Sequence, residues 1–234
     1  MCDAKCVNQV HEQIEKIIAQ YSDAGVTSMG APLRDLAGRA ILDMGAQEYA
    51  HKPSPHCKRM FQAAAQGDTD CIRKSIASGA MADSDGPDQE TPLHYAALHN
   101  QVDMIKFLLS LGADPNLFDA NGHTPLIIAA QGGQFDAVKA LLANRRTKVN
   151  YYDFDGNHAL NHAGINGHNQ IFYHLARAGS ILNHYNYDRK STVRLLLEAG
   201  NYEVVGHIMR DPVLWSSITD ADISEYQEWA AAQK

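Results

Sequence analysis

Residues Thr91–Asn116 read TPLHYAALHNQVDMIKFLLSLGADPN, and related copies of this segment recur along the chain at regular intervals. TPLIIAAQGGQFDAVKALLANRRTKVN begins 33 residues later at Thr124, HALNHAGINGHNQIFYHLARAGSILN begins at His158, and STVRLLLEAGNYEVVGHIM begins at Ser191. An earlier copy, KRMFQAAAQGDTDCIRKSIASGA, begins at Lys58. Five units with a period of 33 or 34 residues predict a solenoid of stacked supersecondary elements.

Each unit has the pattern of two short helices. Thr91 and Thr124 are expected to cap the first helix, with Pro92 and Pro125 at its first position. The second helix, VDMIKFLLSL in the best-matched unit, carries apolar residues at helical spacing, and Gly112 is expected to end it in the left-handed conformation. Because one unit cannot bury its apolar face alone, neighbouring units must stack.

These residues resemble the ankyrin repeat. Thr91-Pro92-Leu93-His94 with Ala96 matches the signature of that family, and Gly112-Ala113-Asp114 with Asn116 matches its usual ending. The resemblance covers residues 58–210. It implies an all-α ankyrin-repeat solenoid of about five helix-turn-helix units joined by hairpin fingers.

The segments outside the repeats are expected to be helical. Within residues 1–55, the stretch Val10–Ile18 predicts an amphipathic helix and Leu33–Met44 a second one. This segment either caps the first repeat or forms a small recruiting domain. At the other end, the last unit has Leu196-Leu197 where the family usually has two alanines, and residues 211–234 predict a C-terminal capping helix.

Composition excludes several classes of function. A net charge of −7 and a pI near 5.9 argue against binding to nucleic acid or an anionic membrane. Four cysteines are too few for a disulfide scaffold in a chain of 234 residues. No apolar run is long enough to span a bilayer, and the N-terminus lacks the features of a signal peptide. We therefore expect a cytoplasmic protein.

The twelve histidines raise the hypothesis of a metal site. His158 and His162 would share a helix face, with His168 and His174 further along, but zinc needs three or four converging ligands. Packed, hydrogen-bonded histidines explain the pattern better, so we expect neither a metal nor another cofactor.

No catalytic constellation is evident, and we expect no enzyme. The alternative is thiol chemistry near His51, His56 and Cys57. It is disfavoured because adjacent residues rarely place a base and a nucleophile correctly.

The resemblance implies that a partner binds the finger tips and the exposed side of each first helix, which together line one concave face. The first finger and its helix contribute Asp85, Pro87, Asp88, Glu90, Leu98 and His99; the second Phe118, Ala120, Asn121, His123 and Gln131; the third Tyr152, Phe154, Asp155, Asn157, Ile165 and Asn166; and the fourth Tyr185, Tyr187, Asp188, Lys190 and Glu198.

Two features of this surface point to a partner. Aromatic residues, which are enriched at binding hot spots, recur on successive fingers as Phe118, Tyr152, Phe154, Tyr185 and Tyr187. The alternative is that these rings only stack between neighbouring units. The acidic residues Asp85, Asp88, Glu90 and Asp155 favour a basic segment of a partner.

The stretch NYYDFDGNH, residues 150–158, illustrates the assignment. Tyr151 lies near the finger base and is expected to pack against its neighbours, whereas Tyr152 and Phe154 are expected to point outward. Asp153 and Gly156 are expected to hold the turn.

These features predict a non-catalytic, monomeric protein–protein interaction module that acts as an adaptor, scaffold or inhibitor. Small solenoids of this kind also resemble bacterial effectors, which would place the protein in a host cytoplasm. The alternative is an adaptor whose residues 1–55 recruit an enzyme complex such as a ubiquitin ligase. APLRDLAGRAILDM faintly resembles the start of an F-box, but too few residues follow it before the first repeat.

Overall fold

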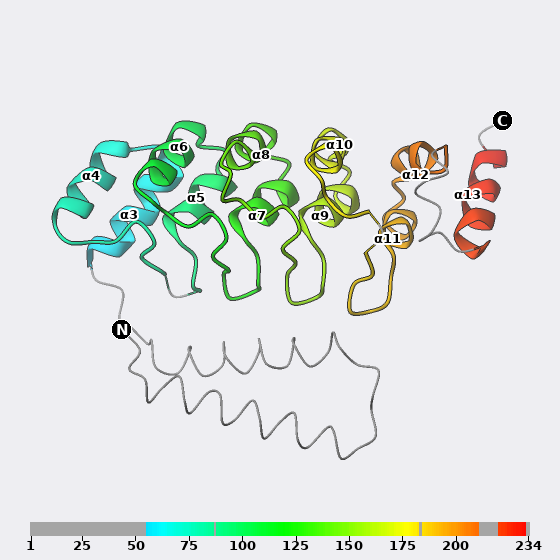
Figure 1. Ribbon diagram of the computed structural model, residues 1–234, viewed down its shortest axis with the longest axis horizontal. Helices are drawn as coiled ribbons and strands as arrows, with labels where there is room; N and C mark the ends of the chain where they lie inside the picture. The colour runs from blue at the N-terminus through cyan, green and yellow to red at the C-terminus, as the bar shows by residue number, and fades with distance from the viewer. Residues whose placement is uncertain (1–54, 87, 183, 211–219, 233–234) are drawn as a thin grey trace, which may run out of the picture. The chain divides into compact units, whose positions relative to one another are not determined.

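The computed structural model describes residues 55–86, 88–182, 184–210 and 220–232 (Figure 1). The chain divides into two units, Met1–Lys52 and Pro53–Lys234, and only the second is described. The helices predicted within residues 1–55 lie outside the described residues, as do Pro87 and the side chains of His51, His56 and Cys57.

The described residues form five helix pairs and one terminal helix. The pairs are α3 (Pro55–Gln66) with α4 (Thr69–Ala77), α5 (Pro92–Leu98) with α6 (Val102–Ser110), α7 (Pro125–Gln131) with α8 (Phe135–Leu142), α9 (Ala159–Ile165) with α10 (Asn169–Arg177), and α11 (Thr192–Glu198) with α12 (Tyr202–Ile208); α13 (Asp220–Ala232) follows. Extended structure among them is limited to two isolated bridges at finger bases, Tyr152–His158 and Tyr185–Ser191. The predicted all-α repeat solenoid is confirmed.

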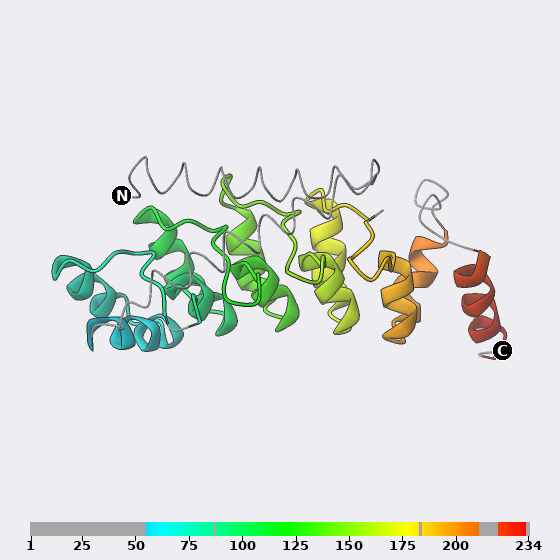
Figure 2. The ribbon, with the colours of Figure 1, turned by 90° about the horizontal axis from the view of Figure 1, so that it is seen from below.

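The helices of successive pairs lie side by side in two rows. Figures 1 and 2 show α3, α5, α7, α9 and α11 in the row beside the fingers, with the second helix of each pair in the other row. The four fingers are residues 80–90, 113–123, 147–157 and 180–190, and each leads into the first helix of the next pair. None of the described helices is long and apolar enough to cross a membrane.

The core is continuous from one pair to the next, and small residues set its spacing. The pairs Ala96-Ala97 and Ala129-Ala130 are fully buried between neighbouring first helices. In α9 the equivalent residues are Ala163 and Gly164, and a Cβ added at Gly164 would clash with the side chain of Leu196. Leu196, which replaces one of the usual alanines in the last unit, is therefore accommodated by the glycine in the unit before it.

The first helices begin as the sequence predicts. Pro92 and Pro125 occupy the first turn, and Thr124 Oγ1 accepts a hydrogen bond from Ile127 N at 3.3 Å. In α5, His94 Nδ1 accepts from Thr91 N at 3.0 Å, while its Nε2 donates to the carbonyl oxygen of His123 at 3.1 Å. This buried imidazole thus joins the start of one helix to the base of the next finger.

The fourth pair builds the same start from different residues. Asn161 Oδ1 accepts from His158 N at 3.2 Å, and Asn161 Nδ2 donates to Thr192 Oγ1 at 3.0 Å. Asn161 therefore replaces the imidazole of His94, and His158 stands where the second, third and fifth units have Thr91, Thr124 and Ser191.

The turns between the helices also agree with the sequence. Gly112 and Gly133 have φ of +97° and +72°, in the left-handed region that favours glycine. Asn100 adopts the same conformation, with φ of +54°. Its Oδ1 accepts from Ala137 N in the next pair at 2.8 Å, which explains an asparagine at this position.

The third unit is one residue longer than the second, and the segment ANRRTK that follows α8, residues 143–148, is held by the preceding unit. Arg146 Nη2 donates to Ala113 O at 2.6 Å, and the side chain of Asn116 contacts Arg146 O at 2.9 Å and Lys148 N at 2.7 Å. The basic run in ANRRTK therefore contributes to the contact between units.

The helix predicted at the C-terminus is present as α13 and packs against α11 and α12. The Tyr202 and Trp229 rings stack with centroids 4.7 Å apart and planes 9° apart. Arg194 Nη1 lies 2.6 Å from Glu225 Oε2. The last pair is thus covered by a helix that does not repeat the pattern.

The free energy of unfolding is expected to depend on pH through His158. Its side chain is buried, and burial together with the nearby His184 ring lowers the pKa of His158 to about 4. An imidazole in the unfolded chain titrates near pH 6.5. Between about pH 6.5 and 4 the unfolded state therefore binds more protons, and the free energy of unfolding should fall as the pH is lowered, by about 1.4 kcal/mol per pH unit from this residue.

Urea unfolding at pH 7, 6 and 5 would test this. We expect His158→Thr, which restores the threonine found at the starts of α5 and α7, to show a shallower loss of stability than the wild type between pH 6 and 5. Identical slopes for the two proteins would contradict the assignment.

Candidate functional site

Each of the last three fingers is closed by one backbone hydrogen bond and one side chain. Asp119 N donates to His123 O at 2.9 Å, and the same bond recurs from Asp153 to Asn157 at 2.9 Å and from Asn186 to Lys190 at 3.0 Å. The side chain of the donor residue then accepts from the amides of its own turn. These bonds fix the finger conformation independently of any ligand.

The turn side chains are the predicted Asp153 and its equivalents. Asp153 Oδ1 accepts from Asp155 N and Asn157 N, both at 2.9 Å. Asp119 Oδ1 accepts in the same way from two amides, at 2.8 and 2.7 Å. Asn186 Oδ1 accepts from Lys190 N at 2.9 Å, so an asparagine can also hold this turn.

The first finger is joined to the second, and the third to the fourth, by a backbone hydrogen bond. Ala120 N donates to Asp88 O at 2.8 Å, and Tyr187 N donates to Asp155 O at 3.0 Å. The approach is close at Gly156, where φ is +80° and an added Cβ would lie 2.9 Å from Tyr187 N. The finger tips therefore follow one another in a fixed order along the row (Figure 1).

Three tyrosines on the third and fourth fingers are exposed. The exposed fractions are 47% for Tyr152, 49% for Tyr185 and 40% for Tyr187. Tyr152 packs edge to face with Tyr187, with centroids 6.0 Å apart, and stacks on His184 at 5.9 Å. We call Tyr152, Tyr185 and Tyr187 the tyrosine surface.

The other aromatic residues of the fingers, Phe118, Tyr151 and Phe154, pack against neighbouring fingers. Phe118 is half-buried against Tyr151, with ring centroids 5.5 Å apart, so Tyr151 packs against a neighbour as predicted while remaining 40% exposed. Phe154 is half-buried, and its Cδ1 would lie 2.8 Å from a Cβ added at Gly122. Both phenylalanines were expected to point outward, and they do so only in part.

Acidic side chains lie exposed along the same row of fingers. They are Asp85 and Asp88 on the first finger, Asp155 on the third and Asp188 on the fourth. Glu90 is half-buried, and its hydrogen bond with Tyr95 raises the pKa of Tyr95 to about 12. Glu90 is therefore engaged within its own unit.

The remaining residues assigned to the surface differ in accessibility. Those exposed to solvent are Leu98, His99, Ala120, Asn121, Gln131, Asn166 and Glu198, whereas Ile165 and Lys190 are half-buried. Lys190 Nζ and Glu198 Oε2 form an ion pair at 2.7 Å. Asn157 is buried, and its Oδ1 accepts from Asn186 Nδ2 at 3.3 Å, so it offers no side chain to a partner.

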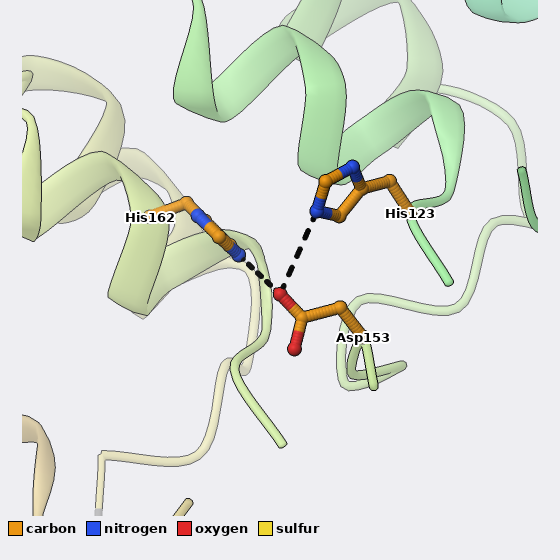
Figure 3. Close-up of side chains that lie close together, drawn as sticks. All are labelled: His123, Asp153 and His162. Atoms are coloured by element: carbon orange, nitrogen blue, oxygen red, sulfur yellow. Dashed lines mark hydrogen bonds and ion pairs between the residues drawn. The ribbon is translucent and has the colours of Figure 1, made fainter. Parts of the chain in front are cut away.

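His123 belongs to a polar cluster that the sequence patterns do not reveal. His162 Nε2 lies 2.6 Å from Asp153 Oδ2, and His123 Nε2 lies 3.7 Å from the same oxygen (Figure 3). Burial opposes ionisation of Asp153, but the hydrogen bonds from His162 and from the Asn157 amide lower its pKa below the ordinary value. Asp153 is therefore a carboxylate at neutral pH.

The histidines grouped by sequence proximity do not converge. His168 Nε2 donates to Gln131 O at 3.1 Å, and His174 packs edge to face on Phe135. Of the predicted group, His162 alone joins the polar cluster, as a hydrogen-bonded residue. The repeat register is the sequence feature that could have predicted the cluster. It places His123 at the end of the second finger and His162 in the helix that follows the third finger, and these two elements are neighbours in the stack.

Stacked helix pairs with a row of hairpins place this protein among the repeat solenoids. Residues 60–109 and 93–142 match the family model of ankyrin repeats (many copies). Residues 60–142 of the chain therefore consist of ankyrin repeats, and repeats of this family generally mediate protein–protein interaction and are typically non-catalytic. No curated protein matches the chain.

Because one finger packs on the next, alanine substitutions at the equivalent positions Gly156 and Arg189 should have different effects on stability. Gly156→Ala should lower the free energy of unfolding by about 1–3 kcal/mol, because its Cβ would meet the backbone of the next finger in a left-handed conformation. Arg189 has the same conformation, with φ of +61°, and is exposed on the last finger. Arg189→Ala should therefore change stability by less than about 0.5 kcal/mol. Equal losses in urea unfolding would show that finger packing is unimportant.

Replacing the turn carboxylate of Asp153 by alanine or by asparagine should affect stability differently. Asp153→Ala should cost about 2–3 kcal/mol, because two amides lose their acceptor. Asp153→Asn should cost less than half as much, since Asn186 holds the same turn in the fourth finger. Chemical unfolding measures both values, and an asparagine variant as unstable as the alanine variant would refute this role of Oδ1.

Proposed function

We propose that this ankyrin-repeat protein binds another protein through the tyrosine surface and the acidic residues beside it, and that it acts as a non-catalytic adaptor, scaffold or stoichiometric inhibitor. The partner contributes a basic, extended segment that lies across the third and fourth fingers.

The observation that carries the proposal is the outward placement of aromatic side chains on a fixed backbone. Among the described residues, four of the eight large apolar side chains that are exposed are tyrosines of the third and fourth fingers. Tyrosine buries a large area on binding and loses little side-chain entropy. Because Tyr152 and Tyr187 already pack on each other, part of the cost of ordering them is met before the partner binds.

The charge of the finger tips supports a basic partner segment. Asp155 and Asp188 lie on the same two fingers as the tyrosines, and Asp85 and Asp88 extend the negative charge along the row. The nearby cation Lys190 is paired with Glu198, so it adds little repulsion toward a basic chain. Such complementarity accelerates association and selects among partners.

Affinity capture with mass spectrometry tests the proposal. The bait with Tyr152, Tyr185 and Tyr187 changed to alanine should retain the partner at least tenfold less than the wild-type bait, because the central aromatic contacts are lost. A matched control changes Met81 and Leu111, which are 70% and 42% exposed outside the tyrosine surface, to alanine and should retain the partner fully.

Circular dichroism would establish that all three baits are folded. Equal capture by the tyrosine variant and the wild type would refute the proposed surface. Loss of capture in the control variant alone would place the partner elsewhere on the chain.

A further inference from the structure

Three side chains with metal-ligating atoms meet between the second and third fingers. His123 comes from the end of the second finger, Asp153 from the third finger, and His162 from α9 (Figure 3). One ligand atom from each lies within 4.8 Å of the other two. The two imidazole rings are nearly perpendicular, at 84°, with centroids 5.6 Å apart.

The spacing of these atoms suits a small divalent metal ion. Bonds of about 2.0–2.1 Å at tetrahedral angles place ligand atoms about 3.3 Å apart. Asp153 Oδ2 lies 2.6 Å from His162 Nε2 and 3.7 Å from His123 Nε2, values on either side of that distance. Movements of less than about 1 Å would bring the three atoms to tetrahedral positions around one ion.

We infer that His123, Asp153 and His162 form a site for Zn²⁺ or a chemically similar divalent transition-metal ion. Two imidazoles and one carboxylate are the donor set that such ions accept, whereas Mg²⁺ and Ca²⁺ prefer oxygen ligands. Three protein ligands leave a fourth position for water. The ion would join the end of the second finger to the third finger and to α9.

The carboxylates around the site are already oriented by the backbone. Asp153 Oδ1 accepts from two amides, which leaves Oδ2 facing the imidazoles. Asp119 Oδ2 lies 3.5 Å from His123 Nδ1, on the side of the ring opposite the Nε2 that faces Asp153. A carboxylate behind a ligating histidine fixes the ring and its tautomer in metal sites, so Asp119 would act as a positioning residue.

The repeat scaffold does not itself require these histidines. The described residues equivalent to His123 in the other units are Glu90, Asn157 and Lys190, and those equivalent to His162 are Gln62, Tyr95, Ile128 and Leu195. Among the described units, two imidazoles face one turn carboxylate only here, between the second and third fingers. The side chains of His123 and His162 are 19% and 13% exposed, so an ion can reach them from solvent.

The test uses the full-length protein, stripped of metal with a chelator and titrated with ZnCl₂ in a calorimeter. We expect saturable binding of Zn²⁺ that loses one equivalent, or weakens at least tenfold, in His162→Leu and in Asp153→Asn. Both replacements occur naturally at equivalent positions, as Leu195 and Asn186, so folding should be preserved. Asp119→Asn should weaken binding about tenfold through the orientation of His123.

Two controls separate this site from other ligands in the chain. His207→Ala removes an exposed histidine on α12 and should leave the binding curve unchanged. Visible absorption of bound Co²⁺ gives a second readout, which should be lost in Asp153→Asn and kept in His207→Ala. The inference is overturned if the wild type binds no Zn²⁺, or if it binds with the same stoichiometry and affinity as His162→Leu and Asp153→Asn.

Discussion

The fold of this protein is stabilised chiefly by the stacking of each helix pair on the next. Each pair has apolar residues that are buried only because a neighbour covers them, and the small side chains of α5, α7 and α9 let the neighbour come close. The packing is complementary in detail, as the fit of Leu196 against Gly164 shows. Because the spacing of the helices is fixed in this way, the spacing of the fingers is fixed too.

The fingers are spaced in the same way as the helix pairs, so their tips form one continuous surface. Hydrogen bonds such as the one from Tyr187 N to Asp155 O tie one finger to the next, and a side chain at a constant position holds the turns of the last three. The tyrosines at the tips therefore stand on a backbone that is already ordered, which would reduce the entropy lost on binding the proposed partner. The turn residue Asp153 has a second use, because its other oxygen faces two histidines.

Much of the fold could be predicted from the sequence because its signals are local and repeated. The period, the prolines at the starts of α5 and α7 and the glycine that follows α6 each specify a backbone conformation within a few residues. The sequence also showed that the last unit is unusual, because it has Leu196-Leu197 in place of alanines. It did not show that Gly164 makes room for Leu196, because that contact joins two different units.

The candidate site could be predicted only in outline. The repeat register identified the tips, but it did not tell outward side chains from those that pack between fingers. Phe154 is half-buried over Gly122, and Asn157 turns inward to Asn186, because each finger lies against the next. The polar cluster was missed for the same reason, since His123 and His162 meet across a finger that lies between them in the sequence.

If a partner binds the tips of the third and fourth fingers, the complex covers those tips. Amide hydrogen exchange, measured on the protein alone and in complex with the protein it captures, detects this. We expect slower exchange on binding in residues 150–157 and 184–190, with little change in α6, α8 and α10, the second helices of their pairs. Slower exchange confined to those helices, with the fingers unchanged, would contradict binding at the tips.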